Sequence, residues 1–166
     1  MTARGKFVLI ASIVFAVDLL TKHAVSMLPH LHGAALIPNF MNVAFEANSG
    51  IFFRLLDGPD SVWRQYLLAG LTLVPVFVIT MVRVHRSWAR SWPQAALALM
   101  TGGLLGNFAD RILHGAIIDF IQVHIEDSPY YPTFNIADLA ITMGMLLFLL
   151  YVPATLRRRT GVQPGS

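Results

Sequence analysis

Four long apolar stretches constrain the fold of this chain more than any other feature. They cover residues 7–25, 66–82, 95–113 and 136–152. Each is near the length, roughly 17–25 residues, that spans the hydrocarbon of a bilayer as a helix. Only 13% of the 166 residues are charged and 55% are hydrophobic, which leaves too little charge for a soluble surface. The sequence therefore predicts an all-α membrane protein with four transmembrane helices, forming a single membrane-embedded domain over residues 1–160 with a disordered tail at 161–166.

The basic residues predict how the chain is oriented in the membrane. Eight of the twelve lie in three short segments that hold none of the nine acidic residues. These eight are Arg4, Lys6, Arg83, Arg86, Arg90, Arg157, Arg158 and Arg159. Short connections rich in lysine and arginine stay in the cytoplasm, so both termini and the middle connection of this multi-pass chain are predicted to be cytoplasmic. The positive charges thus serve topology, and no nucleic-acid partner is expected.

The first periplasmic connection is predicted to carry a small β-sheet. Residues 35–46 are rich in apolar and β-compatible side chains, 48–50 (Asn-Ser-Gly) form a turn signal, and 51–53 are a second apolar run. Asp60 or Ser61 is expected to cap a short helix that leads into the second span. A small periplasmic β-sheet and a short periplasmic helix therefore complete the predicted fold.

Polar side chains lie near the predicted outer ends of the first and third stretches. Asn107, Asp110 and Arg111 are spaced i, i+3 and i+4, which places them on one side of a helix. Asp18 and Lys22 form an i, i+4 pair that neutralises itself, and their presence favours a retained first helix over a cleaved signal peptide. Placing an ionisable side chain in or near the hydrocarbon costs on the order of 3 kcal/mol, so such residues usually have a function. For the trio alone, a structural cluster that holds helices together is an equally good explanation.

Asp119 and Asp138 are the candidates for chemistry. Asp119 interrupts an apolar run, so its side chain is expected to point into a protected space. Asp138 falls in the first turn of the fourth helix, where Asn135 at the N-cap would make it the N3 residue of a capping-box-like arrangement. Singly, each aspartate has an ordinary structural explanation.

Together the two aspartates favour a reaction site. If the connection between them folds back, the two carboxyls cannot both ionise easily, and one keeps a proton while the other stays charged. This is the state that hydrolyses an amide, because the charged member takes a proton from water while the protonated member polarises the carbonyl. The sequence does not assign which aspartate is the base.

Other catalytic classes have less support. The absence of cysteine excludes a thiol nucleophile and an Fe–S cluster. Lys22 lies four residues before Ser26, but a Ser–Lys dyad leaves the polar groups of the third and fourth stretches unexplained. His30 and His32 form an H-x-H, yet no spacing such as H-E-x-x-H is present, so no metal and no cofactor are predicted.

Three short motifs follow one another in the second half of the chain. They are G-N-x-x-D-R at 106–111, G-x-x-x-D-F at 115–120 and F-N-x-A-D at 134–138. With Asp18, Lys22 and the N-x-G turn at 48–50, they make the chain resemble the lipoprotein signal peptidases of bacteria (signal peptidase II) over almost its whole length. The resemblance implies an aspartyl endopeptidase of the bacterial cytoplasmic (inner) membrane that needs no cofactor and acts at the periplasmic face. Its partners would be membrane lipid and prolipoproteins, cleaved before a cysteine that already carries diacylglycerol.

The resemblance also implies roles for individual residues. Asp119 and Asp138 would form the catalytic dyad. The other matched residues would bind the substrate or support the dyad: Asn48, Asn107, Asp110, Arg111, Asn135, Asp18 and Lys22. Within this set, Asn107, Arg111 and Asn135 would orient the substrate backbone and support the dyad, Asp110 would brace the cluster, and Asn48 would contact the substrate from the sheet.

Two alternative functions are considered: a specialised member of the family and a non-enzymatic carrier. After the N-x-G turn the family usually has two small residues, whereas this chain has Ile51 and Phe52, whose bulk would narrow the groove in a specialised paralogue. In a non-enzymatic proton-coupled carrier, a relay through the membrane would be formed by Asp18, Lys22, Asp110 and Arg111. Its charges should be spread across the bilayer, whereas the cytoplasmic halves of the predicted spans carry none.

Overall fold

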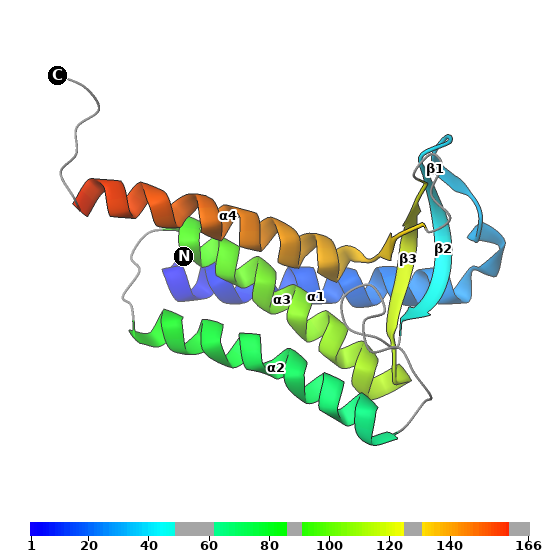
Figure 1. Ribbon diagram of the computed structural model, residues 1–166, viewed down its shortest axis with the longest axis horizontal. Coiled ribbons are helices and arrows are strands. Elements are labelled where there is room, and N and C mark those ends of the chain that lie inside the picture. The colour runs from blue at the N-terminus through cyan, green and yellow to red at the C-terminus, as the bar shows by residue number, and fades with distance from the viewer. Residues whose placement is uncertain (49–61, 86–90, 125–130, 160–166) are drawn as a thin grey trace.

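Four long helices run along the length of the molecule, and a small sheet crosses one end of them (Figure 1). The computed structural model describes residues 1–48, 62–85, 91–124 and 131–159. The helices are α1 (Ala3–Met27), α2 (Val62–His85), α3 (Ser91–His114) and α4 (Ile136–Arg159). Each contains one of the four apolar stretches and extends beyond it at one or both ends, so the prediction of four long helices is confirmed.

Fewer helices qualify as membrane spans than were predicted to span the membrane. Within the described residues, α1 is the one helix whose length and composition suffice to cross a membrane. Shorter apolar segments cover Gly70–Ile79 in α2 and Ile136–Leu150 in α4. α3 carries the buried polar side chains of Asn107, Asp110 and Arg111, which interrupt its apolar character. The four-span topology therefore stays a prediction.

α3 packs against the three other helices, and its glycines let it come close to two of them. A Cβ added to Gly103 would lie 2.5 Å from the carbonyl oxygen of Ala137 in α4. A Cβ added to Gly106 would collide with the carboxylate of Asp18 in α1. Small residues at such contacts allow the backbones of membrane helices to approach. The end of α3 that carries its polar residues is thereby held against the polar residues of α1 and α4.

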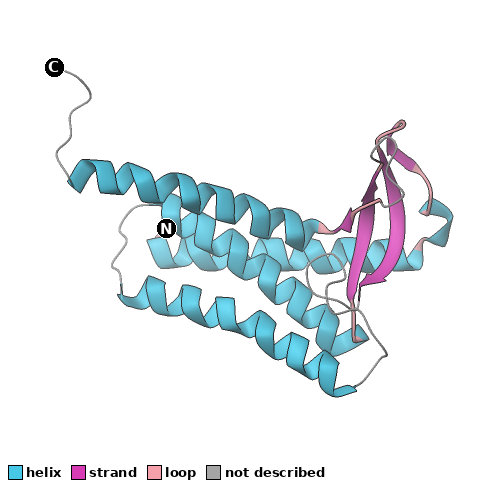
Figure 2. Cartoon of the chain, in the orientation of Figure 1, coloured by secondary structure: helices cyan, strands magenta, loops and turns pink. Residues whose placement is uncertain are grey.

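The predicted sheet is present and is larger than predicted. Its strands are β1 (Ala35–Ile37), β2 (Met41–Asn48), β3 (Ile117–Val123) and β4 (Thr133–Phe134), with a short 3₁₀ helix, η1 (Pro29–Leu31), before β1. All neighbours are antiparallel in the order β1-β2-β3-β4, and Glu46 of β2 is the partner of Asp119 in β3. Figure 2 shows the strands gathered at one end of the helices. The predicted short helix at Asp60 or Ser61, and the bulky Ile51 and Phe52, lie outside the described residues.

Polar side chains occupy part of the interior, and many large apolar side chains lie on the outside of the described helices. The largest side chains with less than 2% exposure are all polar: Lys22, Asn135, Asp18, Asp110 and Asp119. By contrast, Leu20 is 67% exposed and Leu113 is 69% exposed, although both are fully apolar. Ionisable side chains in membrane proteins face the bundle interior, while apolar side chains face lipid. The burial pattern thus agrees with the apolar composition and places the polar cluster inside.

Candidate active site

The ammonium group of Lys22 lies at the centre of the polar cluster. Its Nζ is 2.7 Å from Asp18 Oδ2 on the same helix and 2.7 Å from Asp110 Oδ2 on α3. It also donates a hydrogen bond of 3.1 Å to Asn107 Oδ1. The predicted pairing of Asp18 with Lys22 is confirmed, and Asp110 is a second partner that the local spacing did not reveal. One buried cation therefore faces two buried carboxylates.

Each of these carboxylates also holds the backbone next to one of the two candidate aspartates. Asp18 Oδ1 accepts a hydrogen bond of 2.8 Å from the amide of Ala137, the residue before Asp138. Asp110 Oδ2 accepts one of 3.1 Å from the amide of Ile118, the residue before Asp119. The Asp18–Lys22–Asp110 cluster therefore fixes both aspartates to the same support, although they are far apart in the chain.

The start of α4 has the predicted capping-box geometry. Asn135 Oδ1 accepts a hydrogen bond of 2.9 Å from the amide of Asp138, and Asp138 Oδ2 accepts one of 3.4 Å from the amide of Asn135. The other carboxylate oxygen, Asp138 Oδ1, accepts a hydrogen bond of 2.8 Å from Asn107 Nδ2 on α3. Such donors, at a helix N-terminus, stabilise the charged form of a carboxylate.

Asp119 occupies a more enclosed position on β3. Its side chain is 1% exposed, which confirms the prediction of a protected space. Asp119 Oδ1 accepts a hydrogen bond of 2.7 Å from Asn135 Nδ2, and Oδ2 accepts one of 3.0 Å from Asn48 Nδ2. Burial raises the pKa of Asp119 to about 7; the hydrogen bond from Asn48 opposes this rise, and the charge of Asp138 adds to it. A group with this pKa holds a proton about half of the time at neutral pH.

Asn135 links the two aspartates directly. Its side chain donates to the Asp119 carboxylate through Nδ2 and accepts from the Asp138 amide through Oδ1. The same Nδ2 lies 3.3 Å from Asn107 Oδ1, whose own amide nitrogen bonds Asp138. Asn135 is fully buried. The two aspartates thus belong to one hydrogen-bond network.

Two further candidate residues are Asn48, which contacts this network, and Arg111, which is buried near it. Asn48, for which the resemblance implied a contact with the substrate, donates a hydrogen bond to Asp119 itself. Arg111 is buried in the last turn of α3, next along the chain to Asp110. Its role toward the substrate stays a prediction.

One contact near the site could not be foreseen from the motifs. Thr133 Oγ1 donates a hydrogen bond of 2.7 Å to Glu46 Oε2 and so ties β4 to β2 across β3. Thr133 lies two residues before Asn135, and Glu46 lies two residues before Asn48. No sequence signal pairs residues 87 positions apart, so this contact becomes visible only in the folded chain.

The groups proposed for other chemistries are placed elsewhere. Ser26 is exposed, and its Oγ donates to the carbonyl oxygen of His23 at 2.7 Å, while Lys22 is held by the carboxylate cluster. His32 stacks on Phe45, with 5.5 Å between the ring centroids. Among the residues that the structure describes, no group of three His, Cys, Asp or Glu side chains is arranged to hold a metal ion.

Comparison with known proteins decides the family. The family model described as "Signal peptidase (SPase) II" matches residues 10–153. The chain belongs to the signal peptidase II family. It is 37% identical over 158 residues to the lipoprotein signal peptidase of Yersinia enterocolitica, covering 95% of this chain and 92% of that one. It is 31% identical over 144 residues to that of Francisella tularensis subsp. novicida, covering 87% and 89% respectively.

Solved structures agree with this assignment. A bacterial membrane enzyme determined by the in meso method at 2.3 Å superposes with a TM-score of 0.78 at 27% identity, covering 98% of this chain and 94% of that one. A second, determined at 1.9 Å, gives a TM-score of 0.74 at 29% identity, with 89% and 92% covered. Membership of signal peptidase II makes the protein a membrane protease of lipoprotein processing, acting on lipoprotein precursors.

Proposed function

We propose that the protein is an aspartyl endopeptidase in which Asp119 and Asp138 hydrolyse the peptide bond before a diacylglyceryl-modified cysteine. The observation that carries this proposal is the contact of one buried side chain, Asn135, with both aspartates. The second support is the pKa of Asp119, which burial and the charge of Asp138 raise to about 7. Aspartyl chemistry requires two carboxyls in one network, of which one can hold a proton at neutral pH while the other is charged.

The reaction uses the two carboxyls in complementary protonation states. Asp138, at a helix N-terminus and with two donors on its oxygens, is the charged member that takes a proton from water. Asp119 is protonated and donates a hydrogen bond to the oxygen of the scissile carbonyl while the hydroxide adds to the carbonyl carbon. The tetrahedral intermediate then collapses, the proton gained by Asp138 passes to the leaving amine, and the C–N bond breaks. The pair titrates as a unit, so the pH dependence of the reaction belongs to both groups.

The substrate is proposed to reach this site from the membrane. The apolar surfaces of the helices, exemplified by Leu20 and Leu113, would face lipid and the apolar helix of a signal peptide. With both termini in the cytoplasm, the sheet end of the molecule faces the periplasm, where the lipid-modified cysteine of a prolipoprotein lies. Binding along an apolar helix positions the scissile bond, and positioning supplies much of the rate gain of such a reaction.

The test is cleavage of a diacylglyceryl-prolipoprotein by purified protein, with the new N-terminus identified by mass spectrometry. Asp119→Asn and Asp138→Asn should each lose cleavage while keeping their melting temperature. Ser26→Ala is the matched control and should cleave at the parent rate, because Ser26 is exposed and its Oγ donates to the carbonyl oxygen of His23 on the same helix. Loss of cleavage in Ser26→Ala together with activity in both Asp→Asn variants would replace the proposal with a Ser–Lys mechanism.

The same assay addresses the two alternatives. A specialised paralogue would cleave a small subset of prolipoproteins, and replacing Ile51 and Phe52 by alanine would widen that subset. A proton-coupled carrier would cleave none and would move protons in vesicles. The charged groups buried in the described helices, Asp18, Lys22 and the Asp110–Arg111 pair, gather at the sheet end and form no relay along the helices, which speaks against a carrier.

A further inference from the structure

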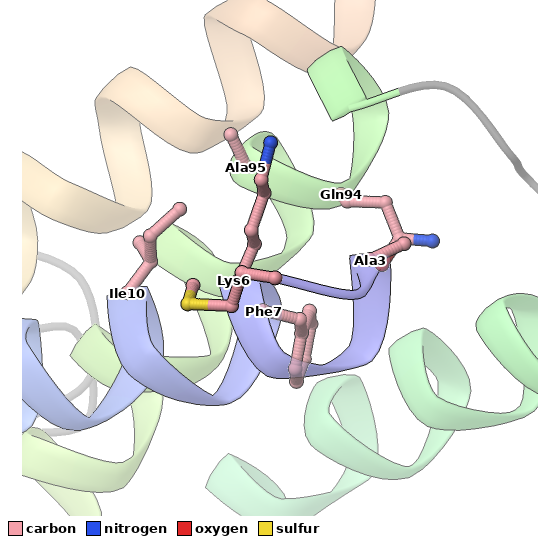
Figure 3. Close-up of a pocket in the computed structure, with 7 residues that line it drawn as sticks. Ala3, Lys6, Phe7, Ile10, Gln94 and Ala95 are labelled. Atoms are coloured by element: carbon pink, nitrogen blue, oxygen red, sulfur yellow. The ribbon is translucent and has the colours of Figure 1, made fainter.

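A cavity of about 300 Å³ lies at the end of the molecule opposite the candidate active site. It is bounded by the first turns of α1 and α3, with Lys6, Phe7 and Ile10 from α1 and Gln94 and Ala95 from α3 among its lining residues (Figure 3). Lys6 precedes Lys22 by 16 positions, which corresponds to roughly 24 Å along a helix. The cavity is therefore separate from the polar cluster and takes no part in the hydrolysis described above.

The lining of this cavity is amphipathic. Figure 3 shows the side chain of Lys6 extending from α1 past Ala95, so that its ammonium group lies at the α3 side of the cavity. The carboxamide of Gln94 is a second polar group, whereas Phe7, Ile10 and Ala95 form apolar walls. A cation beside an apolar wall fits a ligand that has a negative head and an apolar tail.

The charge of Lys6 is not balanced by the helices around it. The acidic residues of the four helices are Asp18, Asp110 and Asp138, and all three lie at the other end. Arg4 adds a second positive charge one half-turn earlier on α1, but it does not line the cavity. This end of the molecule therefore attracts anions, and the Lys6 ammonium is the side-chain cation that lines the cavity, together with Met1, the residue that carries the N-terminal amine.

We propose that this cavity binds an anionic phospholipid, with its phosphate at Lys6 and the start of an acyl chain against Phe7 and Ile10. The proposal rests on the proposed topology, which places the N-terminus of α1 at the cytoplasmic surface. Basic pockets between membrane helices on that side bind anionic head groups. The apolar walls favour a lipid over free phosphate, which would leave Phe7 and Ile10 against water.

The test is lipid binding to the full chain in detergent, followed by native mass spectrometry and by the melting temperature. Phosphatidylglycerol is compared with phosphatidylcholine of the same acyl chains and with inorganic phosphate. The parent protein should bind phosphatidylglycerol selectively and melt at a higher temperature with it. Lys6→Gln should weaken this binding about fivefold, as expected for one basic residue near an anionic lipid. Ala95→Phe, which fills the cavity, should abolish the selective binding without removing a charge.

Arg4→Gln is the matched control, because it removes the same charge from the same turn without touching the cavity. It should bind phosphatidylglycerol as the parent does. Equal loss in Arg4→Gln and Lys6→Gln would show diffuse attraction and overturn the site. If phosphatidylcholine stabilised the protein as much as phosphatidylglycerol does, the site would not select a negative head group and the proposal would be wrong. If inorganic phosphate did so, the site would not need a lipid and the proposal would also be wrong. None of these readouts involves cleavage, so they separate failure of this site from failure of the proposed protease.

Discussion

Replacing Lys22 by methionine tests the role of the buried cation in holding the site together. Methionine keeps much of the volume of lysine and removes the charge. Asp18 and Asp110, which are 0% and 1% exposed, would then face each other without the ammonium that lies 2.7 Å from each. Removing one partner of a buried ion pair costs roughly 3–5 kcal/mol, because the remaining charges stay buried. For a chain of this size the melting temperature should fall by roughly 6–20 °C.

The assay is thermal unfolding in detergent, without substrate or added lipid. Lys6→Met is the matched control, since it makes the same substitution on the same helix at an exposed position, and its melting temperature should not change. Asp110→Asn in the Lys22→Met background should restore part of the lost stability, since it removes one of the two facing charges; the two substitutions are then coupled by about 0.5–3 kcal/mol. If Lys22→Met kept the parent melting temperature but lost cleavage, Lys22 would act on the substrate and would not hold the buried carboxylates together.

Three further outcomes follow from the contacts. Asn48→Ala should move the alkaline limb of kcat/KM to higher pH, because the lost hydrogen bond holds down the pKa of Asp119, which is about 7 in the parent; a rise in KM with an unmoved limb would show that Asn48 acts on the substrate alone. Thr133→Val should lower stability by about 1.5–3 kcal/mol, the value of a hydrogen bond to a charged group, whereas Thr133→Ser should not. Gly103→Ala should lower the melting temperature because its Cβ meets a carbonyl of α4, whereas Gly70→Ala, which meets nothing within 4 Å, should not; equal effects would contradict the packing argument.

The parts of the fold with local signals could be predicted from the sequence. Apolar runs long enough to span a membrane predicted the four helices. The start of α4 was predicted because Asn135 and Asp138 have the spacing of N-cap and N3 residues. The i, i+4 spacing of Asp18 and Lys22 gave their ion pair. In each case the interacting residues lie within about one turn of a helix, so the pattern contains the geometry.

The parts that depend on long-range pairing could not be predicted in the same way. Residues 117–123 show no alternation of polar and apolar side chains, because β3 is buried over most of its length, so the sequence predicts an apolar run around Asp119 and no strand. The register that pairs Glu46 with Asp119 depends on a bulge in β2, which no local pattern reports. The contacts of Asp110 with Lys22 and of Asn48 with Asp119 join separate elements, and they follow from the fold as a whole.

Asp119 and Asp138 are proposed to act as one proton-sharing pair. The most direct measurement is a carbon NMR titration of the Asp119 carboxyl, in the parent protein and in Asp138→Asn. The account predicts a midpoint near pH 7 in the parent, set by burial and raised further by the Asp138 charge, and a lower midpoint in the variant, which lacks that charge. A midpoint near the ordinary value of 3.8 in the parent, or one that does not move when Asp138 becomes Asn, would contradict it.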